Sequence, residues 1–226
     1  MTAGTPLPPA RKIPDAASSV DDLQDRPLAF YNALLTEHFV LESARGITVS
    51  ESSSRASLYL MTLSSALVAF GFLASTPFAF GYLAVLIPIV FILGVFTYIR
   101  LVQTSLEDVA ALSSIQRIRQ YYATLLPGAE TFFPIPPGAV PNEMLDIGQR
   151  GYRRGVFFTV SSSIGIVNSL LAGAGTALFV YAMTPSYPLA ISLGFTAALI
   201  LAVSHGIYQE NRYARLRAIL TQSDAT

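Results

Sequence analysis

The sequence predicts an all-α integral membrane protein with four transmembrane helices arranged as two hairpins. Of the 226 residues, 52% are hydrophobic and only 12% are charged, about half the usual share for a soluble domain. Residues 56–99 and residues 155–209 contain no Lys, Arg, Asp or Glu. Because one bilayer-spanning helix needs roughly 20 apolar residues, each charge-free stretch has room for two spans and a short turn.

The segment before the first span divides into two parts. Residues 1–26 are rich in Pro and Asp and poor in large apolar residues, which predicts a disordered cytoplasmic tail. Residues 27–55 are predicted to form an amphipathic helix at the cytoplasmic membrane surface, in which Gly46 is expected to act as a breaker and the serines at 50–54 to weaken it. Its apolar stripe consists of Leu28, Tyr31, Leu35 and Phe39.

Residues 56–100 are assigned to the first transmembrane hairpin. The first span is expected at about 57–75 and the second at about 78–99, joined by a turn at Thr76–Pro77. Pro88 lies inside the second span and is expected to kink it.

Residues 101–154 form the predicted cytoplasmic segment between the hairpins. Neither Gly nor Pro occurs between Arg100 and Pro127, and apolar residues keep a helical spacing, so the second span should continue as a long cytoplasmic helix, the stalk. Glu107 and Asp108 are expected to pair with arginines of a neighbouring stalk. A Pro-rich loop at 127–141 and a short helix complete the segment.

Residues 155–209 are assigned to the second hairpin, with spans at about 156–182 and 189–208 and a turn at 184–188. Residues 210–226 are predicted to be a cytoplasmic tail. All 14 basic residues lie before position 56, within 100–154 or after 209. The positive-inside rule therefore places these segments and both termini in the cytoplasm of a multi-pass cell-membrane protein.

Small residues recur at every fourth position in the third and fourth spans, which permits close helix approach in a bilayer. The favoured interpretation is packing of the two spans on each other, and the alternative is a homo-oligomer contact. The residues are Ser161, Gly165, Ser169 and Gly173 in the third span, and Gly194, Ala198, Ala202 and Gly206 in the fourth.

Asn168 near the middle of the third span should face protein or water, because an unpaired amide is costly in hydrocarbon. An interhelical hydrogen bond is the favoured interpretation. The alternative is a pore-lining role together with Ser161 and Thr176, which lie near the same helix face. His205 is interpreted as an interfacial residue, with pH sensing as the alternative.

The densest basic group comprises Arg117 and Arg119 together with Arg150, Arg153 and Arg154. The last three flank the third span and are predicted to contact anionic lipid headgroups. Zero net charge gives no reason to expect a nucleic-acid partner.

No catalytic motif occurs, and the absence of cysteine removes thiolate chemistry and Cys-ligated zinc, so no cofactor or metal is expected. The leading hypothesis is a non-enzymatic, homo-oligomeric membrane protein, a scaffold or assembly subunit, whose working surface is cytoplasmic and can hold a cytoplasmic protein partner. The alternative is a cytoplasmically gated channel or pore-forming effector. An enzyme acting through residues 127–154 is a third hypothesis, which lacks a nucleophile or metal set.

Overall fold

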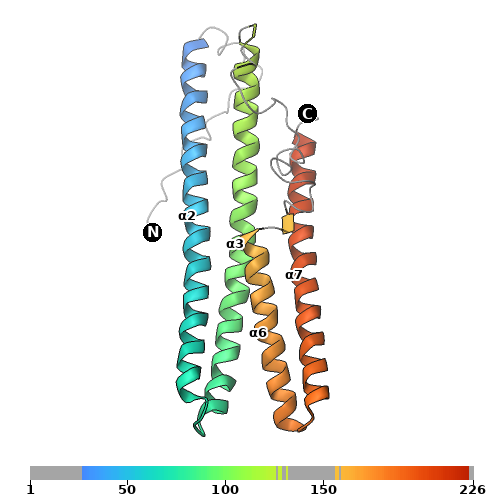
Figure 1. The fold of residues 1–226 in the computed structure, drawn as a ribbon. Coiled ribbons are helices and arrows are strands. Elements are labelled where there is room, and N and C mark those ends of the chain that lie inside the picture. The colour runs from blue at the N-terminus through green and yellow to red at the C-terminus, as the bar shows by residue number, and fades with distance from the viewer. Residues whose placement is uncertain (1–26, 126, 129–130, 132–155, 158, 224–226) are drawn as a thin grey trace, which may run out of the picture. The chain divides into compact units, whose positions relative to one another are not determined.

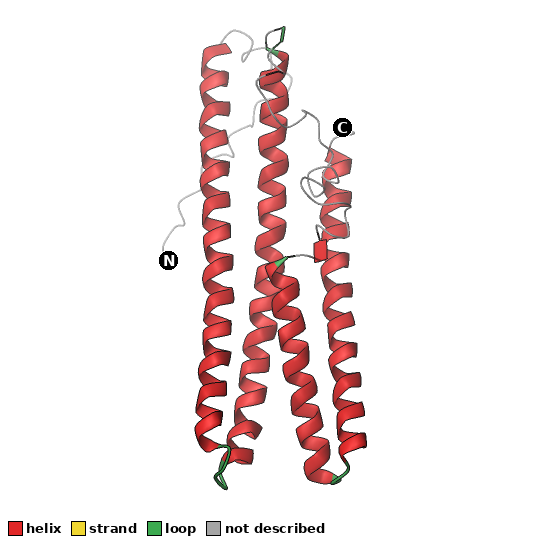
Figure 2. Ribbon diagram, in the orientation of Figure 1, coloured by secondary structure: helices red, strands yellow, loops and turns green. Residues whose placement is uncertain are grey.

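The computed structural model describes residues 27–125, 127–128, 131, 156–157 and 159–223 of the chain. Those residues are almost entirely helical and include no strand. Figures 1 and 2 show the four long helices. They are α2 (Pro27–Leu73), α3 (Ala79–Thr124), α6 (Val160–Met183) and α7 (Tyr187–Ser223).

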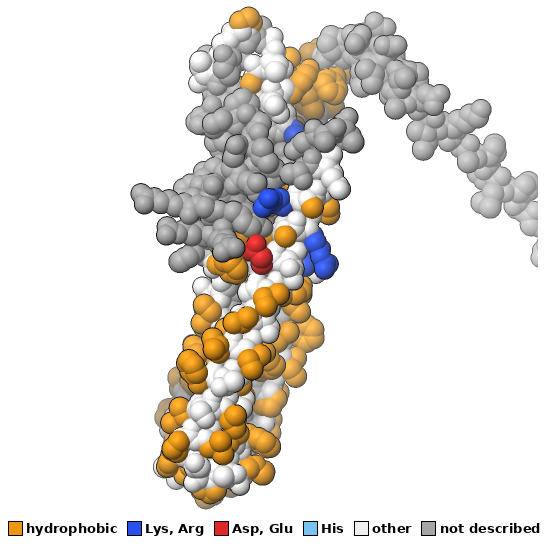
Figure 3. All heavy atoms as spheres, turned by 90° about the vertical axis from the view of Figure 1, so that its right-hand side faces the viewer, with side chains coloured by type: hydrophobic (Ala, Val, Ile, Leu, Met, Phe, Trp, Pro, Cys, Tyr) orange, Lys and Arg blue, Asp and Glu red, His pale blue; other side chains and the backbone are white. Residues whose placement is uncertain are grey.

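All four helices are long and apolar enough to cross a membrane. This finding, with the all-helical content, confirms the predicted class of a helical protein with four candidate transmembrane helices. On the face drawn in Figure 3, hydrophobic side chains cover the lower part, and the Arg and Asp/Glu side chains drawn lie above it. Helices α2 and α3 contain 47 and 46 residues. At 1.5 Å per residue each is about 70 Å long, more than twice the hydrocarbon thickness of a bilayer.

Helix α2 continues through Gly46 and the serines at 50–54, where the sequence pattern predicted an interruption. A Gly inside a helix costs only about 1 kcal/mol, and ion pairs of Arg45 and Glu51 flank this stretch. The amphipathic segment and the first span are therefore one helix, not two elements.

Helix α7 is also longer than predicted. It continues to Ser223, whereas the sequence pattern predicted a span that ends near Tyr208. Residues 207–223 contain neither Gly nor Pro, and Ala, Leu and Arg favour helix. Tyr213 in this extension is buried, so the extension belongs to the packed core. The predicted tail at 1–26, most of the Pro-rich loop and the short helix before 155 lie outside the described residues.

The chain divides into two compact units, residues 1–40 and 41–226. In the first unit, the described part is the beginning of α2, and its Leu28 and Phe39 are 72% and 64% exposed. The second unit contains the rest of α2 with α3, α6 and α7, and its core includes large side chains from every helix: Tyr59, Tyr98, Leu101, Ile164 and Tyr213. The buried residues of α3 run from Val90 to Ile118, so the first eleven residues of this helix lie outside the core.

Candidate functional site

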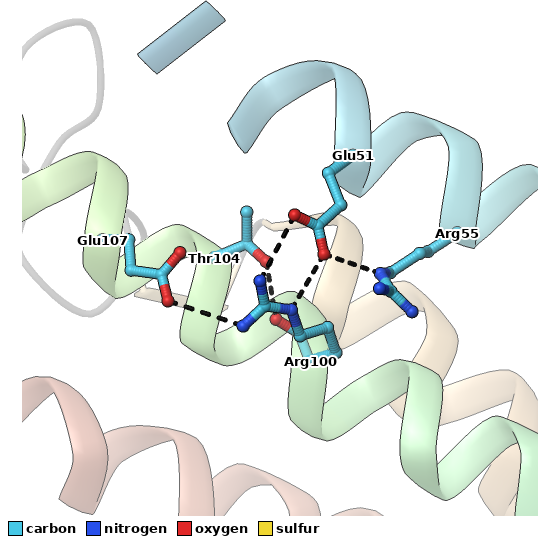
Figure 4. A network of polar contacts seen from close by, with 5 residues as sticks. All are labelled: Glu51, Arg55, Arg100, Thr104 and Glu107. Carbon is cyan, nitrogen blue, oxygen red and sulfur yellow. Dashed lines mark hydrogen bonds and ion pairs between the residues drawn. The ribbon is translucent and has the colours of Figure 1, made fainter. Parts of the chain in front are cut away.

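A network of ion pairs joins α2 and α3 at the ends of their charge-free stretches (Figure 4). The Arg100 guanidinium donates to both carboxylate oxygens of Glu51, with Nε at 2.8 Å from Oε1 and Nη2 at 3.3 Å from Oε2. Arg55 Nε donates to the same Oε1 at 2.8 Å. Arg100 Nη1 also lies 3.5 Å from Glu107 Oε1. Glu51 thus pairs with two arginines, and Arg100 pairs with two carboxylates.

The two arginines lower the pKa of Glu51 to about 2, chiefly through the hydrogen bond from Arg100 and then through that from Arg55. The same pairing raises the pKa of Arg100. Both groups therefore stay charged at neutral pH, and a charged group is costly within hydrocarbon.

Glu107 and Asp108 find partners within their own chain. Arg45 Nε donates to Asp108 Oδ1 at 2.9 Å, and Glu107 faces Arg100. The sequence pattern predicted that these two carboxylates pair with arginines of a neighbouring stalk. They pair within the chain instead, because the continuous helix α2 carries Arg45 alongside α3.

Gln209 of α7 is the centre of an uncharged polar cluster at the start of α6. Its Nε2 donates to the Val156 carbonyl and, at 3.0 Å, to Thr159 Oγ1. Its Oε1 accepts from Ser162 Oγ at 3.2 Å. Thr159 also caps α6, since its side chain accepts from the Ser162 N–H. The 1%-exposed glutamine thus ties α7 to the first turn of α6.

Tyr98 connects α3 to this cluster. Its hydroxyl donates to the His205 carbonyl, and its ring meets the His205 ring edge to face at a centroid distance of 4.5 Å. His205 Nδ1 lies 3.2 Å from Ser169 Oγ, and Ser169 also donates to the Gly165 carbonyl. His205 is therefore part of a helix–helix contact and not simply interfacial.

Asn168 and Tyr59 form the deepest polar pair, and both are fully buried. The Tyr59 hydroxyl donates to Asn168 Oδ1 at 3.3 Å, which links α2 to α6. Gly94 of α3 makes room for this pair, since a Cβ at that position would meet Asn168 Oδ1 at 2.1 Å. Asn168 Nδ2 is buried and has no hydrogen-bond partner. The side chain thus lies among three helices.

The small-residue ladders bring α6 and α7 backbone to backbone at their centre. A Cβ on Gly173 would lie 2.7 Å from the Gly194 carbonyl oxygen and from Ala198 Cβ. A Cβ on Gly165 would instead lie 3.2 Å from the Tyr98 ring, and a Cβ on Gly206 would lie 3.6 Å from Phe157. Ala202 lines a cavity of about 340 Å³ together with Gly165 and His205.

The polar residues proposed to line a pore do not share one environment. Ser161 is buried and contacts Thr159, whereas Asn168 is enclosed beside Tyr59 and Gly94. Thr176 lines a separate apolar groove and donates to its own Ala172 carbonyl at 2.9 Å. The predicted headgroup contacts Arg150, Arg153 and Arg154 lie outside the described residues.

A second cavity, of about 530 Å³, lies beside the ion-pair network. Hydroxyl groups dominate its polar lining, and Asp108 contributes a carboxylate. Burial raises the pKa of Tyr213 in its wall, so the phenol stays neutral. Within the described ranges, no three His, Cys, Asp or Glu side chains lie close enough to hold a metal ion. The hydroxyl residues are Thr48, Ser52, Ser53, Ser57, Thr104, Ser105, Thr159, Ser161 and Tyr213.

Tyr59, Tyr98, Gly94 and Gln209 were not recognisable as contact residues from the sequence pattern. Gln209 stands at the edge of a charge-free stretch, where polar residues are ordinary, and tyrosines are common near membrane boundaries. One usable signal was the pairing of a mid-span Gly with a mid-span Asn, since each suggests a close contact. Comparison with family models, curated proteins and solved structures found no match to this chain, so its function is inferred from its own residues and geometry.

Proposed function

We propose that this protein is a non-enzymatic, homo-oligomeric multi-pass membrane protein, a scaffold or assembly subunit, whose working surface is cytoplasmic. The observation that carries the proposal is an apolar stripe at the start of α2. Leu28, Leu35 and Phe39 follow one side of the helix and are exposed in the single chain. They lie 17 to 28 residues before the charge-free stretch that begins at residue 56, outside the predicted bilayer span.

Exposed large apolar groups outside the membrane are costly in water and are typical of interaction surfaces. A helix face with apolar residues at a spacing of three or four suits a helical partner. We assign this face to a second copy of the chain, because the carboxylates of the stalk are already neutralised within the chain and leave apolar contact as the assembly force.

The proposed topology places both termini and the stalk in the cytoplasm of the cell membrane. The one-sided distribution of basic residues supports it. So do the two short turns, near 74–78 and 184–186, which lie at the same end of the helices in Figure 1. In this arrangement Arg150, Arg153 and Arg154 lie on the cytoplasmic side beside anionic headgroups. The cytoplasmic surface also offers a docking site for a protein partner.

The test replaces Leu28, Leu35 and Phe39 together with Gln and measures the oligomeric state of the full chain in detergent by light scattering. The matched control replaces Ala29, Ala33 and Thr36, which are exposed on another side of the same helix, with Gln. We expect the first variant to be monomeric and the control to keep the wild-type mass. A wild-type protein that is monomeric, or an oligomer unchanged in the first variant, would overturn the proposal.

A cytoplasmically gated channel is the second candidate, and the buried polar side chains between the helices favour it. Gln209, Tyr98, His205, Ser169 and Asn168 lead from the charged end of the span toward its middle. The test is ion flux into liposomes that contain the protein, compared with an Asn168→Leu variant of equal stability. Flux that the substitution reduces supports a channel, and the absence of flux in the wild type rejects it.

A further inference from the structure

An apolar groove of about 440 Å³ lies between the first turns of α3 and the last turns of α6. This volume is within the range of small-molecule sites in proteins. The groove lies at the end of α3 that precedes the buried core, because the core residues of this helix begin only at Val90. Phe80 and Phe179 stand in its lining and are more than half exposed. The surface is thus open to the surrounding lipid.

The helix wall of the groove lacks one intrahelical donor. Pro88 has no N–H, so the carbonyl of Ala84, four residues earlier, lacks its usual intrahelical donor. Both residues line the groove. In hydrocarbon no water is present to replace that donor, and an unpaired carbonyl is costly there. The Thr176 hydroxyl lies in the same lining and donates to its own helix, which leaves its oxygen free to accept another bond.

The shape of the lining restricts the occupant. Ala84, Ala172 and Gly175 give the groove a floor of small residues, and Phe80, Phe91 and Phe179 supply aromatic walls. At Gly175 the two helices are in close contact, since a Cβ there would lie 2.7 Å from Ile87 Cγ2. A rigid, flat ring system covers such a floor with less loss of conformational entropy than a flexible acyl chain does.

We propose that this groove binds a polycyclic lipid alcohol of the sterol type, whose hydroxyl donates to the Ala84 carbonyl and whose rings lie against Ala172, Gly175 and Phe91. Ala84 is five residues from the start of α3, roughly 8 Å along the helix. The hydroxyl then lies near the membrane surface at the turn between α2 and α3, where the polar group of a lipid alcohol belongs. The ring system points toward the middle of the bilayer.

The first experiment maps the groove with a diazirine derivative of cholesterol, using the full chain in phosphatidylcholine nanodiscs and peptide mass spectrometry. A phosphatidylcholine with a diazirine in its acyl chain serves as the comparison probe. We expect the sterol probe to label residues 80–91 and 172–179 selectively and unlabelled cholesterol to compete. Equal labelling of these segments by the two probes, or sterol labelling spread along all lipid-facing helices, would overturn the proposal.

A groove-filling substitution tests the location. Ala84→Leu places extra volume in the groove at an exposed position and keeps a good helix former, so we expect sterol labelling to fall about tenfold or more. Ala174→Leu is the matched control, because Ala174 is also exposed, on α6, but does not line the groove. Equal labelling of the two variants would contradict the assigned site.

The hydrogen bond is tested by Pro88→Ala, which gives the Ala84 carbonyl its intrahelical donor back. In competition with the sterol probe, we expect unlabelled cholesterol to bind this variant about three- to tenfold more weakly than the wild type, the value of one hydrogen bond. A cholesterol analogue that lacks the hydroxyl should bind the variant and the wild type equally well. The control is Pro188→Ala, at the start of α7, where no helix donor is missing. Equal loss of both ligands would show that only helix shape matters and would refute the carbonyl contact.

Discussion

The helix pairs α6–α7 and α2–α3 are held together by different means. Helices α6 and α7 form the most extensive close approach of backbones in the structure, with Gly173 against Gly194 and Ala198. Helix α2 reaches its neighbours through long side chains instead, with Arg45 on Asp108, Glu51 on Arg100 and Tyr59 on Asn168. The α6–α7 pair therefore relies on small residues, and α2 relies on long side chains that reach its neighbours.

The difference follows from the two solvents that the helices meet. In hydrocarbon, close packing of backbones replaces the hydrophobic driving force, so small residues carry the α6–α7 contact. At the boundary with water, charged groups keep partial solvation and pair across a wider gap, which makes each pair weak. We therefore expect the α6–α7 contact to tolerate little added volume and the α2–α3 contact to tolerate most single substitutions.

The largest expected effect is that of Gly173→Leu. The first carbon of the new side chain would lie 2.7 Å from a backbone oxygen of α7, which cannot move without shifting the helix. We expect a loss of about 3 kcal/mol or more in the free energy of unfolding, at or above the upper range for overpacking. Denaturation of the purified protein in mixed micelles, followed by circular dichroism, measures it.

The control for this substitution is Gly81→Leu, because no atom lies within 4 Å of a Cβ built on that exposed glycine. This variant should be at least as stable as the wild type and up to about 1 kcal/mol more stable, because Leu favours helix more than Gly does. If both variants lose the same stability, close backbone approach is not what distinguishes the α6–α7 pair.

The second effect, smaller than the first, is that of Gln209→Leu. The substitution leaves the buried Val156 carbonyl and Thr159 hydroxyl without their donor, so we expect a loss of about 1–2 kcal/mol in the free energy of unfolding. The same micelle denaturation measures it. Gln120→Leu, at an exposed position of α3, is the control.

A loss for Gln120→Leu as large as that for Gln209→Leu would mean that the change in surface polarity, rather than the hydrogen bonds, sets the stability. A Gln209→Glu variant sharpens the test. It keeps the acceptor for Ser162 but removes the donor to Val156 and Thr159, so it should be no more stable than Gln209→Leu.

The helical class and the presence of four candidate spans were predictable because charge is the strongest signal in a membrane sequence, and residues 56–99 and 155–209 lack it. The lengths of α2 and α7 could not be predicted in the same way. The penalty of Gly46 is local and small, and the ion pairs that flank it join residues such as Arg45 and Asp108, 63 positions apart. No local pattern reports such a partner.

The candidate site was predicted only in part for the same reason. Asn168 was identified because an amide within an apolar span is unusual by itself. Tyr59 and Gly94, its neighbours, are ordinary residues in such spans, and only the fold brings them together. Gln209 likewise gains its role from the carbonyl of Val156, a backbone atom that no side-chain pattern can reveal.

The smallest expected effect belongs to the ion pairs of α2 and α3, and it depends on pH. The pKa of Glu51 falls from 4.5 to about 2 in the folded chain, because Arg100 and Arg55 hydrogen-bond to its ionised form. The unfolded chain then binds this proton more readily than the folded one. The stabilisation is therefore complete above about pH 4.5 and is lost as the pH falls toward 2.

Glu51→Gln should lower the Tm in micelles by at most a few degrees at pH 7, and the difference from the wild type should shrink as the pH falls through 2 and vanish below it. Glu37→Gln, at an exposed position of the same helix, is the matched control. A difference that stays unchanged as the pH falls from 7 to below 2 would mean that Glu51 acts through packing. The α2–α3 pair would then depend on volume, as α6–α7 does, and the contrast between the two pairs would fail.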